Sequence, residues 1–128
     1  MLDRRTFILT AAALGLAPRG ANSDGALELV MVEEVGCRWC ARWNAEIAPI
    51  YPKTEEGRIA PLRRLDIRDV APGTLAVTQP VVFTPTFVLA RDGAEIDRIE
   101  GYPGEELFWW FLAAVMNNND LTPGGETE

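Results

Sequence analysis

Both cysteines of this chain, Cys37 and Cys40, lie in the segment EEVGCRWCARW, residues 33–43. The preceding segment, Ala26 to Glu34, is rich in aliphatic residues and is ended by Gly36, which is typical of a strand. From the first cysteine onward, apolar residues recur at three- and four-residue spacing, which predicts a helix. The pair therefore lies at the start of a helix that follows a strand, and this placement constrains both the fold and the chemistry.

Cysteines at these two positions of a helix are suited to thiolate chemistry. The Cys37 thiol lies among backbone N–H groups that have no partner within the helix, and the positive end of the helix dipole also stabilises its anion. Cys40 lies one turn further along, where the helix covers it. We therefore expect Cys37 to be the exposed nucleophile with a low pKa and Cys40 to be the buried, resolving thiol. The positive charge of Arg38 favours the thiolate further.

Two other uses of the cysteine pair are less well supported. A disulfide across four residues removes little entropy from the unfolded chain, so it is a poor structural staple. A zinc site needs four ligands, and the chain has no histidine, so two cysteines would have to recruit carboxylates or a second chain. The missing histidine also excludes Ser–His and Cys–His catalytic pairs. Redox exchange through a Cys37–Cys40 disulfide, with no metal or other cofactor, is the favoured interpretation.

The N-terminal residues 1–23 have the pattern of an export signal. Arg4 and Arg5 precede an apolar run from Thr6 to Ala17, and small residues then favour cleavage after Ser23. The start of this pattern resembles a twin-arginine signal, so the general secretory and twin-arginine routes both stay open. A helix of the fold and an uncleaved membrane anchor are the alternatives. We predict a periplasmic protein that contacts the membrane only through this segment, if it is retained.

The charge of the chain restricts its partners. Without residues 1–23, it has 9 basic and 18 acidic residues, and so a net charge of −9. Such a chain repels phosphate backbones and anionic lipid surfaces, which argues against nucleic-acid binding. The basic cluster of Arg58, Arg63, Arg64 and Arg68 alternates with apolar residues, which favours a solvated strand edge over a binding patch.

The pattern of strands and helices predicts an α/β domain over residues 24–116, followed by a polar, flexible tail over residues 117–128. Pro49 should kink or end the first helix, and Pro52 should close it. The Asp92-Gly93 turn predicts an antiparallel hairpin at one edge of a mixed sheet. The expected strands are Ala26–Glu34, Arg58–Ile67, Val81–Ala90 and Glu95–Glu100; the final helix starts near Pro103 and buries Leu107, Trp110, Phe111, Ala114 and Val115.

Three features together resemble the thioredoxin superfamily over Ala26 to Met116. They are the strand that leads to CRWC at a helix start, the Thr-Pro-Thr of residues 84–86, and the closing hairpin with its amphipathic helix. The segments MVEEVGCRWC, APLRRLDIRD, FTPTFVL and EGYPGEELFW are most similar to the periplasmic SoxS-type thioredoxins of bacterial sulfur-oxidation gene clusters. The implied fold is thioredoxin-like, with a central mixed β-sheet flanked by helices.

The resemblance also implies the roles of residues near the cysteine pair. The peptide bond between Thr84 and Pro85 is expected to be cis, and the backbone of Thr84 is expected to pair with an extended substrate segment. Trp39, Gly101 and Tyr102 are expected to line an apolar docking surface near Pro85.

One position departs from the superfamily pattern. Thioredoxins have a buried aspartate, thought to help deprotonate the resolving thiol, where this chain has Met31. Glu33 and Glu34 lie nearer to the cysteines in sequence and are candidates to replace it and to tune the thiols. Ordinary solvated carboxylates are the alternative.

The sequence thus predicts a monomeric thiol–disulfide oxidoreductase of the periplasm. The Cys37 thiolate attacks a disulfide of a partner protein, Cys40 releases the reduced product, and a membrane thiol-reductant donor restores the dithiol. The resemblance implies a sulfur-oxidation carrier protein as the substrate. A thiol oxidant is one alternative, and a non-catalytic regulator that docks a partner through the thioredoxin groove is another.

Overall fold

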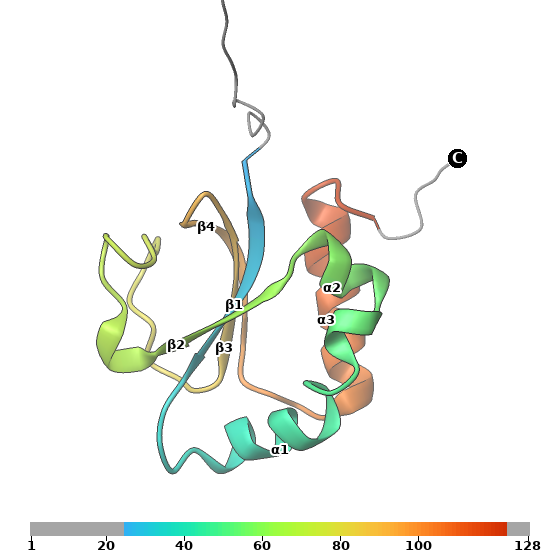
Figure 1. Cartoon of the computed structure of the whole chain (residues 1–128), viewed down its shortest axis with the longest axis horizontal. Coiled ribbons are helices and arrows are strands. Elements are labelled where there is room, and N and C mark those ends of the chain that lie inside the picture. The colour runs from blue at the N-terminus through green and yellow to red at the C-terminus, as the bar shows by residue number, and fades with distance from the viewer. Residues whose placement is uncertain (1–24, 123–128) are drawn as a thin grey trace, which may run out of the picture.

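The fold is built on a four-stranded sheet with the strand order β2-β1-β3-β4. The computed structural model describes residues 25–122, and the α-helices of this range pack beside the sheet (Figure 1). Strand β1 is parallel to β2 and antiparallel to β3, which is in turn antiparallel to β4, so the predicted mixed sheet is confirmed. The elements are β1 (Leu27–Glu33), α1 (Arg38–Glu46), η2 (Tyr51–Lys53), α2 (Glu55–Ile59), β2 (Leu62–Asp66), η3 (Ile67–Asp69), β3 (Thr86–Arg91), β4 (Ala94–Glu100) and α3 (Glu105–Asn118).

Each face of the sheet has its own hydrophobic cluster, because successive side chains of a strand point to opposite faces. On one face, Met31 of β1 and Phe87 of β3 pack with buried side chains of α1 and α3. On the other face, Val30 and Val88 pack with Leu75 and other apolar residues of the segment that joins β2 to β3. The first cluster is the larger, and it holds the start of α1 against the sheet.

The structure describes the C-terminal end of the predicted domain but not the predicted export signal. The predicted export signal, residues 1–23, lies outside the described residues. At the other end, α3 continues to Asn118 and Leu121 packs against the core, so the folded domain extends past the boundary predicted after Met116. Residues 123–128 of the predicted tail lie outside the described range. Within residues 25–122, no helix is long and apolar enough to cross a membrane.

Helix α1 is shorter than the helix predicted from Cys37. It ends at Glu46, a turn surrounds Pro49, and Pro52 lies in the first turn of η2. Proline has no N–H to donate and a fixed φ, so it is found where a helix ends or begins. The helix therefore ends before Pro49, which is the second of the two outcomes expected for this proline, and is not kinked there.

For the strand predicted over Arg58–Ile67, Pro61 favours a late start or an edge position, and β2 does begin at Leu62 and lies at the edge of the sheet. The first residues of the predicted strand belong instead to α2. The hydroxyl of Thr54 caps this helix by accepting a hydrogen bond from the N–H of Gly57 at 3.0 Å. Two glutamates follow the capping threonine, where they complement the positive end of the helix dipole. This local signal outweighs the alternation of arginines and apolar residues.

Strand β3 begins at Thr86 rather than at Val81, where the sequence placed its start. Pro85 has no N–H to donate to the sheet, and the residues before it form a loop that leads into the strand. The hairpin of β3 and β4 is confirmed, with Asp92 and Gly93 at its turn. Both turn residues have positive φ, of 53° and 81°, a conformation that Asp and Gly adopt more readily than other residues.

The buried face of α3 is not the one predicted. Of the five residues expected there, only Val115 is buried, and Trp110 is 63% exposed. Every residue from Leu107 to Met116 is apolar, so spacing alone could not choose a face. The face that is buried is the one that places the ring of Phe108 against Trp43. The buried residues are Phe108, Leu112, Val115 and Met116.

Two phenylalanines of α3 test this assignment. We expect Phe108→Ala to lower the free energy of unfolding by about 3–5 kcal/mol, because it leaves a cavity among four aromatic rings. Phe111→Ala, on the exposed side of the same helix, should cost about 1 kcal/mol or less. Urea unfolding followed by tryptophan fluorescence measures both. Equal losses would contradict the assigned face.

Candidate active site

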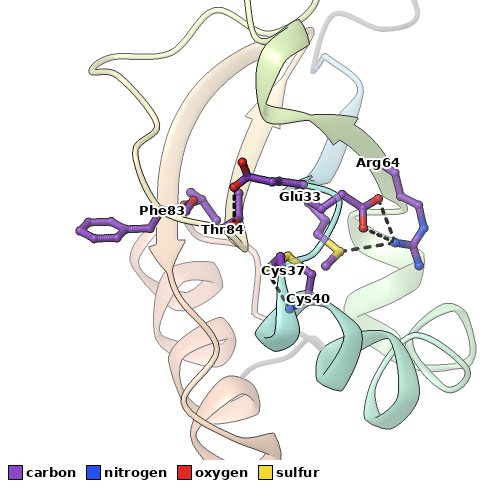
Figure 2. Close-up of a disulfide and its surroundings, with 9 residues drawn as sticks. Glu33, Cys37, Cys40, Arg64, Phe83 and Thr84 are labelled. Carbon is purple, nitrogen blue, oxygen red and sulfur yellow. Dashed lines mark hydrogen bonds and ion pairs between the residues drawn. A yellow bond between two sulfur atoms is a disulfide. The ribbon is translucent and has the colours of Figure 1, made fainter.

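The two cysteines form a disulfide at the start of α1, with their Cα atoms 5.2 Å apart (Figure 2). Cys37 is the N-cap residue of the helix, and its Sγ accepts a hydrogen bond from the backbone N–H of Cys40 at 3.0 Å. Cys40 is 3% exposed and belongs to the core cluster, whereas Cys37 is partly exposed. Cys37 is therefore the sulfur that a partner protein can reach.

The loop that leads into β3 carries Thr84 and Pro85, and Thr84 lies near the disulfide (Figure 2). The peptide bond between these two residues is cis. The Thr84 hydroxyl donates a hydrogen bond to the carboxylate of Glu34 at 3.2 Å. The N–H of Gly101 donates to the carbonyl of Pro85 at 2.8 Å. These bonds join the loop before α1, the loop before β3 and the end of β4.

A groove with a volume of about 370 Å³ opens between these loops. Of the residues predicted to bind substrate, the groove brings together Trp39, Thr84, Gly101 and Tyr102; Phe83 and Glu100 also line it. Trp39 is 45% exposed and Phe83 57%, so two large apolar side chains are open to a partner. Tyr102 is buried and forms the floor rather than an exposed wall.

Phe83 and Glu100 were missed by the sequence analysis. The residue pattern had placed Phe83 inside a long strand, where it would be one of several buried apolar residues. Because β3 begins only at Thr86, Phe83 lies in the loop and points outward (Figure 2). The sequence signal for this difference is Pro85 itself, because a proline inside a predicted strand has no N–H to donate to the sheet. Glu100 ends β4, and only the pairing of β4 with β3 places it at the groove.

A chain of polar contacts supports the floor and one wall of the groove. The Tyr102 hydroxyl donates to Glu46 Oε1 at 2.5 Å, and Arg42 pairs with the other carboxylate oxygen at 3.2 Å. The Arg42 guanidinium lies 5.5 Å from the centre of the Trp39 ring, within cation–π range. The hydrogen bond from Tyr102 lowers the pKa of Glu46, and the hydrogen bond from Arg42 lowers it further. Burial, followed by the hydrogen bond to Glu46, raises the pKa of Tyr102.

The two glutamates before the cysteines have different partners. Glu33 accepts hydrogen bonds from Arg64 Nη1 through both carboxylate oxygens, each at 3.2 Å (Figure 2). The same nitrogen lies 3.6 Å from the sulfur of Met31, the residue that stands at the position of the superfamily's buried aspartate. Glu34 binds Thr84, as described above. The charge of Glu33 is thus offset by an arginine, and Glu34 is bonded to Thr84, a residue that lines the groove.

The arrangement is suited to the exchange of two electrons between dithiol and disulfide. It has a reachable sulfur at a helix start, a second sulfur within bonding distance and an open groove beside them. Among the residues that the structure describes, no group of three or more His, Cys, Asp or Glu side chains could hold a metal ion.

Comparison with known proteins identifies the family. No protein-family model matches the chain, and the comparison with curated proteins gives no match. Among solved structures, it is similar to the periplasmic thioredoxin SoxS from Paracoccus pantotrophus in its reduced form. The two share 54% identity and a TM-score of 0.69, over 73% of this chain and 98% of that one. The chain belongs to the thioredoxin superfamily.

Two further thioredoxins share the fold. Fasciola hepatica thioredoxin is 23% identical over 73% of this chain and 85% of its own, with a TM-score of 0.52. A poplar thioredoxin h is 24% identical over 75% and 82%, with a TM-score of 0.50. The predicted thioredoxin-like fold and the relationship to SoxS-type thioredoxins are therefore confirmed. With its Cys-x-x-Cys disulfide, this thioredoxin is a thiol–disulfide oxidoreductase.

The contact between Tyr102 and Glu46 predicts a pH-dependent stability. Because the folded-state pKa of Glu46 is below its ordinary value of 4.5, the contact stabilises the fold above that pH. This contribution is lost as the pH falls through the lower, folded-state pKa. We therefore expect Tyr102→Phe to destabilise the protein more at about pH 7 than at about pH 3, measured by urea unfolding.

The matched control for this prediction is Glu46→Gln, which removes the ionisable group and keeps the shape of the side chain. In a Glu46→Gln background, Tyr102→Phe should have the same effect at both pH values. A pH-dependent effect that persists in this background would show that another group is responsible.

Proposed function

We propose that this protein is a periplasmic reductase of disulfides in a partner protein, and that the partner is a carrier protein of sulfur oxidation. The observation that carries the proposal is the reachable Cys37 at a helix start beside an open groove, in a chain 54% identical to a periplasmic thioredoxin. The export pattern of residues 1–23 supports the compartment. The sequence resemblance to SoxS-type thioredoxins supports the kind of partner.

The proposed reaction transfers two electrons to the partner. In the reduced protein, the Cys37 thiolate attacks one sulfur of the partner disulfide, which forms a mixed disulfide and releases the other partner sulfur as a thiolate. Cys40, as a thiolate, then attacks Cys37 Sγ and releases the second partner sulfur. The partner thiolates take protons from solvent, and the protein is left with its Cys37–Cys40 disulfide. A membrane dithiol donor supplies two electrons and restores the dithiol.

The surroundings of Cys37 support its role as the attacking thiolate. The N–H of Cys40 already donates to Cys37 Sγ, and α1 directs its positive end toward the same atom. Arg38 is exposed beside it, and we infer that its charge favours the thiolate. Glu33 and Glu34 oppose this effect, but each also interacts with an arginine, Glu33 with Arg64 and Glu34 with Arg68.

The groove supports binding of an extended partner segment. Thr84 lies two residues before the start of β3, where an added strand could continue the sheet. The rings of Trp39 and Phe83 offer apolar contacts on either side of such a segment. Because the groove offers a backbone edge and apolar side chains for contact, it suits a partner segment that is extended around its disulfide.

Trapping of the mixed disulfide tests the reaction. Cys40→Ser should accumulate a covalent complex with the partner through Cys37, because the resolving thiol is missing. The variant is expressed with its own N-terminal segment in sulfur-oxidising bacteria, and complexes are separated by non-reducing electrophoresis and identified by mass spectrometry.

Cys37→Ser is the control and should trap nothing. A Cys40→Ser variant that captures no protein, in cells where Cys37→Ser keeps its biological effect, would support the non-catalytic regulator instead. A complex that forms only with cytoplasmic proteins would contradict the proposed compartment.

The reduction potential tests the direction of electron flow. A reductase should have a potential more negative than about −200 mV, because its disulfide must be more stable than that of the proteins it reduces. Equilibration with glutathione or dithiothreitol buffers, followed by thiol counting, measures it. A value near about −120 mV, typical of strongly oxidising periplasmic enzymes, would contradict the proposed direction and support a thiol oxidant.

A further inference from the structure

Two buried, charged side chains of β4 lie apart from the cysteines, and the proposed reaction gives them no role. Arg98 and Glu95 face each other with Nε–Oε2 and Nη2–Oε1 distances of 2.6 and 2.8 Å. Their side chains are only 8% and 4% exposed. Removing two charges from water is expensive, and a well-packed apolar pair often stabilises a fold as well as a buried ion pair does. Stability alone is therefore a weak explanation for this pair.

The pair is bonded to three consecutive residues of the loop that leads to the groove. Glu95 Oε1 accepts from the N–H of Thr78 at 2.8 Å and from its hydroxyl at 3.1 Å. Arg98 donates to the carbonyl of Gln79 at 2.7 Å and to that of Pro80 at 3.3 Å. An apolar pair could make none of these four bonds, whereas the planar guanidinium donates in several fixed directions at once.

The same arginine also reaches a wall of the groove. Arg98 Nη1 donates to Glu100 Oε2 at 3.2 Å, and Glu100 lines the groove. The loop that Arg98 and Glu95 hold, residues 78–83, ends in Phe83, which is exposed and also lines the groove. Arg98 thus donates hydrogen bonds both to Glu100 and to the loop that ends in Phe83.

The electrostatics of Glu95 agree with this geometry. Burial alone would raise the pKa of Glu95, but the hydrogen bonds from Arg98 and Thr78 outweigh it and lower the pKa below 4.5. Glu95 is thus an anion near neutral pH and accepts from the loop and from the arginine together.

We propose that Arg98 and Glu95 are positioning residues for partner docking, because they anchor the 78–83 loop that presents Phe83 and Thr84 at the groove. Neither residue touches the reacting sulfur atoms. They act by keeping the loop ordered before the partner arrives, so that binding does not have to order it. This inference rests on the proposed function, in which the groove binds the partner.

The substitution Arg98→Lys tests the inference with little risk to the fold. Lysine keeps a positive charge opposite Glu95 but cannot donate to Gln79, Pro80 and Glu100 together. We expect the KM for reduction of insulin, with dithiothreitol as electron donor, to rise about fivefold while kcat stays unchanged; this corresponds to the loss of about one net hydrogen bond. The reaction of the reduced protein with 5,5′-dithiobis(2-nitrobenzoic acid), a small disulfide that needs no groove, should keep its rate.

The chain offers a matched control on the opposite edge of the sheet. Arg63 pairs with Glu28 at 2.8 Å and donates to the carbonyl of Thr74 at 2.9 Å, so it also anchors a loop. Thr74 does not line the groove. Arg63→Lys should therefore leave the insulin KM unchanged. An equal rise in both variants would show a general effect of stability and would overturn the inference.

Two further variants separate the possible outcomes. Thr78→Val, an exposed substitution that leaves the ion pair intact, removes one bond to Glu95 and should raise the insulin KM about twofold. Phe83→Ala probes the groove itself. If Phe83→Ala raises KM but Arg98→Lys and Thr78→Val do not, the anchoring role is wrong and the groove stands. If all three leave KM unchanged, the groove is not the docking site and the inference is wrong, whereas disulfide reduction itself stands. A failure of the unsubstituted protein to reduce insulin at all would instead contradict the proposed function.

Discussion

The packing of three aromatic rings fixes the position of the redox site. Trp43 of α1 lies 5.1 Å from Phe87 of β3 and 5.7 Å from Phe108 of α3, and these last two are 5.0 Å apart. Trp43 follows Cys40 by less than one helical turn, and Phe87 follows Pro85 by two residues. The rings therefore hold the cysteine helix against the strand that carries the proline loop. Such pairs stabilise beyond the area they bury, and their shapes permit few alternative arrangements.

Local features of the sequence were predictable, and long-range ones were not. The strand, the cysteine pair and the helix start depend on neighbouring residues, so their pattern was sufficient. The buried face of α3 depended on contact with Trp43 and Phe87, because every residue of the segment from Leu107 to Met116 is apolar. In the same way, the roles of Phe83 and Glu100 depended on where β3 begins and how it pairs with β4.

Three arginine–carboxylate pairs hold parts of the site in place. Arg42, Arg64 and Arg98 each bind a carboxylate, and each of these pairs supports a different part of the site: the floor, the loop before the cysteines and the loop before the proline. The sequence shows the excess of acidic residues but not which of them pair with an arginine near the site. A count of charges describes the field at a distance, whereas the site depends on which charges are neighbours.

The hydrogen bond from the N–H of Cys40 to Cys37 Sγ has a consequence for turnover. A thiolate accepts such a bond at least as well as a disulfide sulfur does, so the same backbone serves both oxidation states at this point. This hydrogen bond therefore does not have to be exchanged for another one when the disulfide opens. Exchange of two electrons in either direction thus begins and ends with the same helix start.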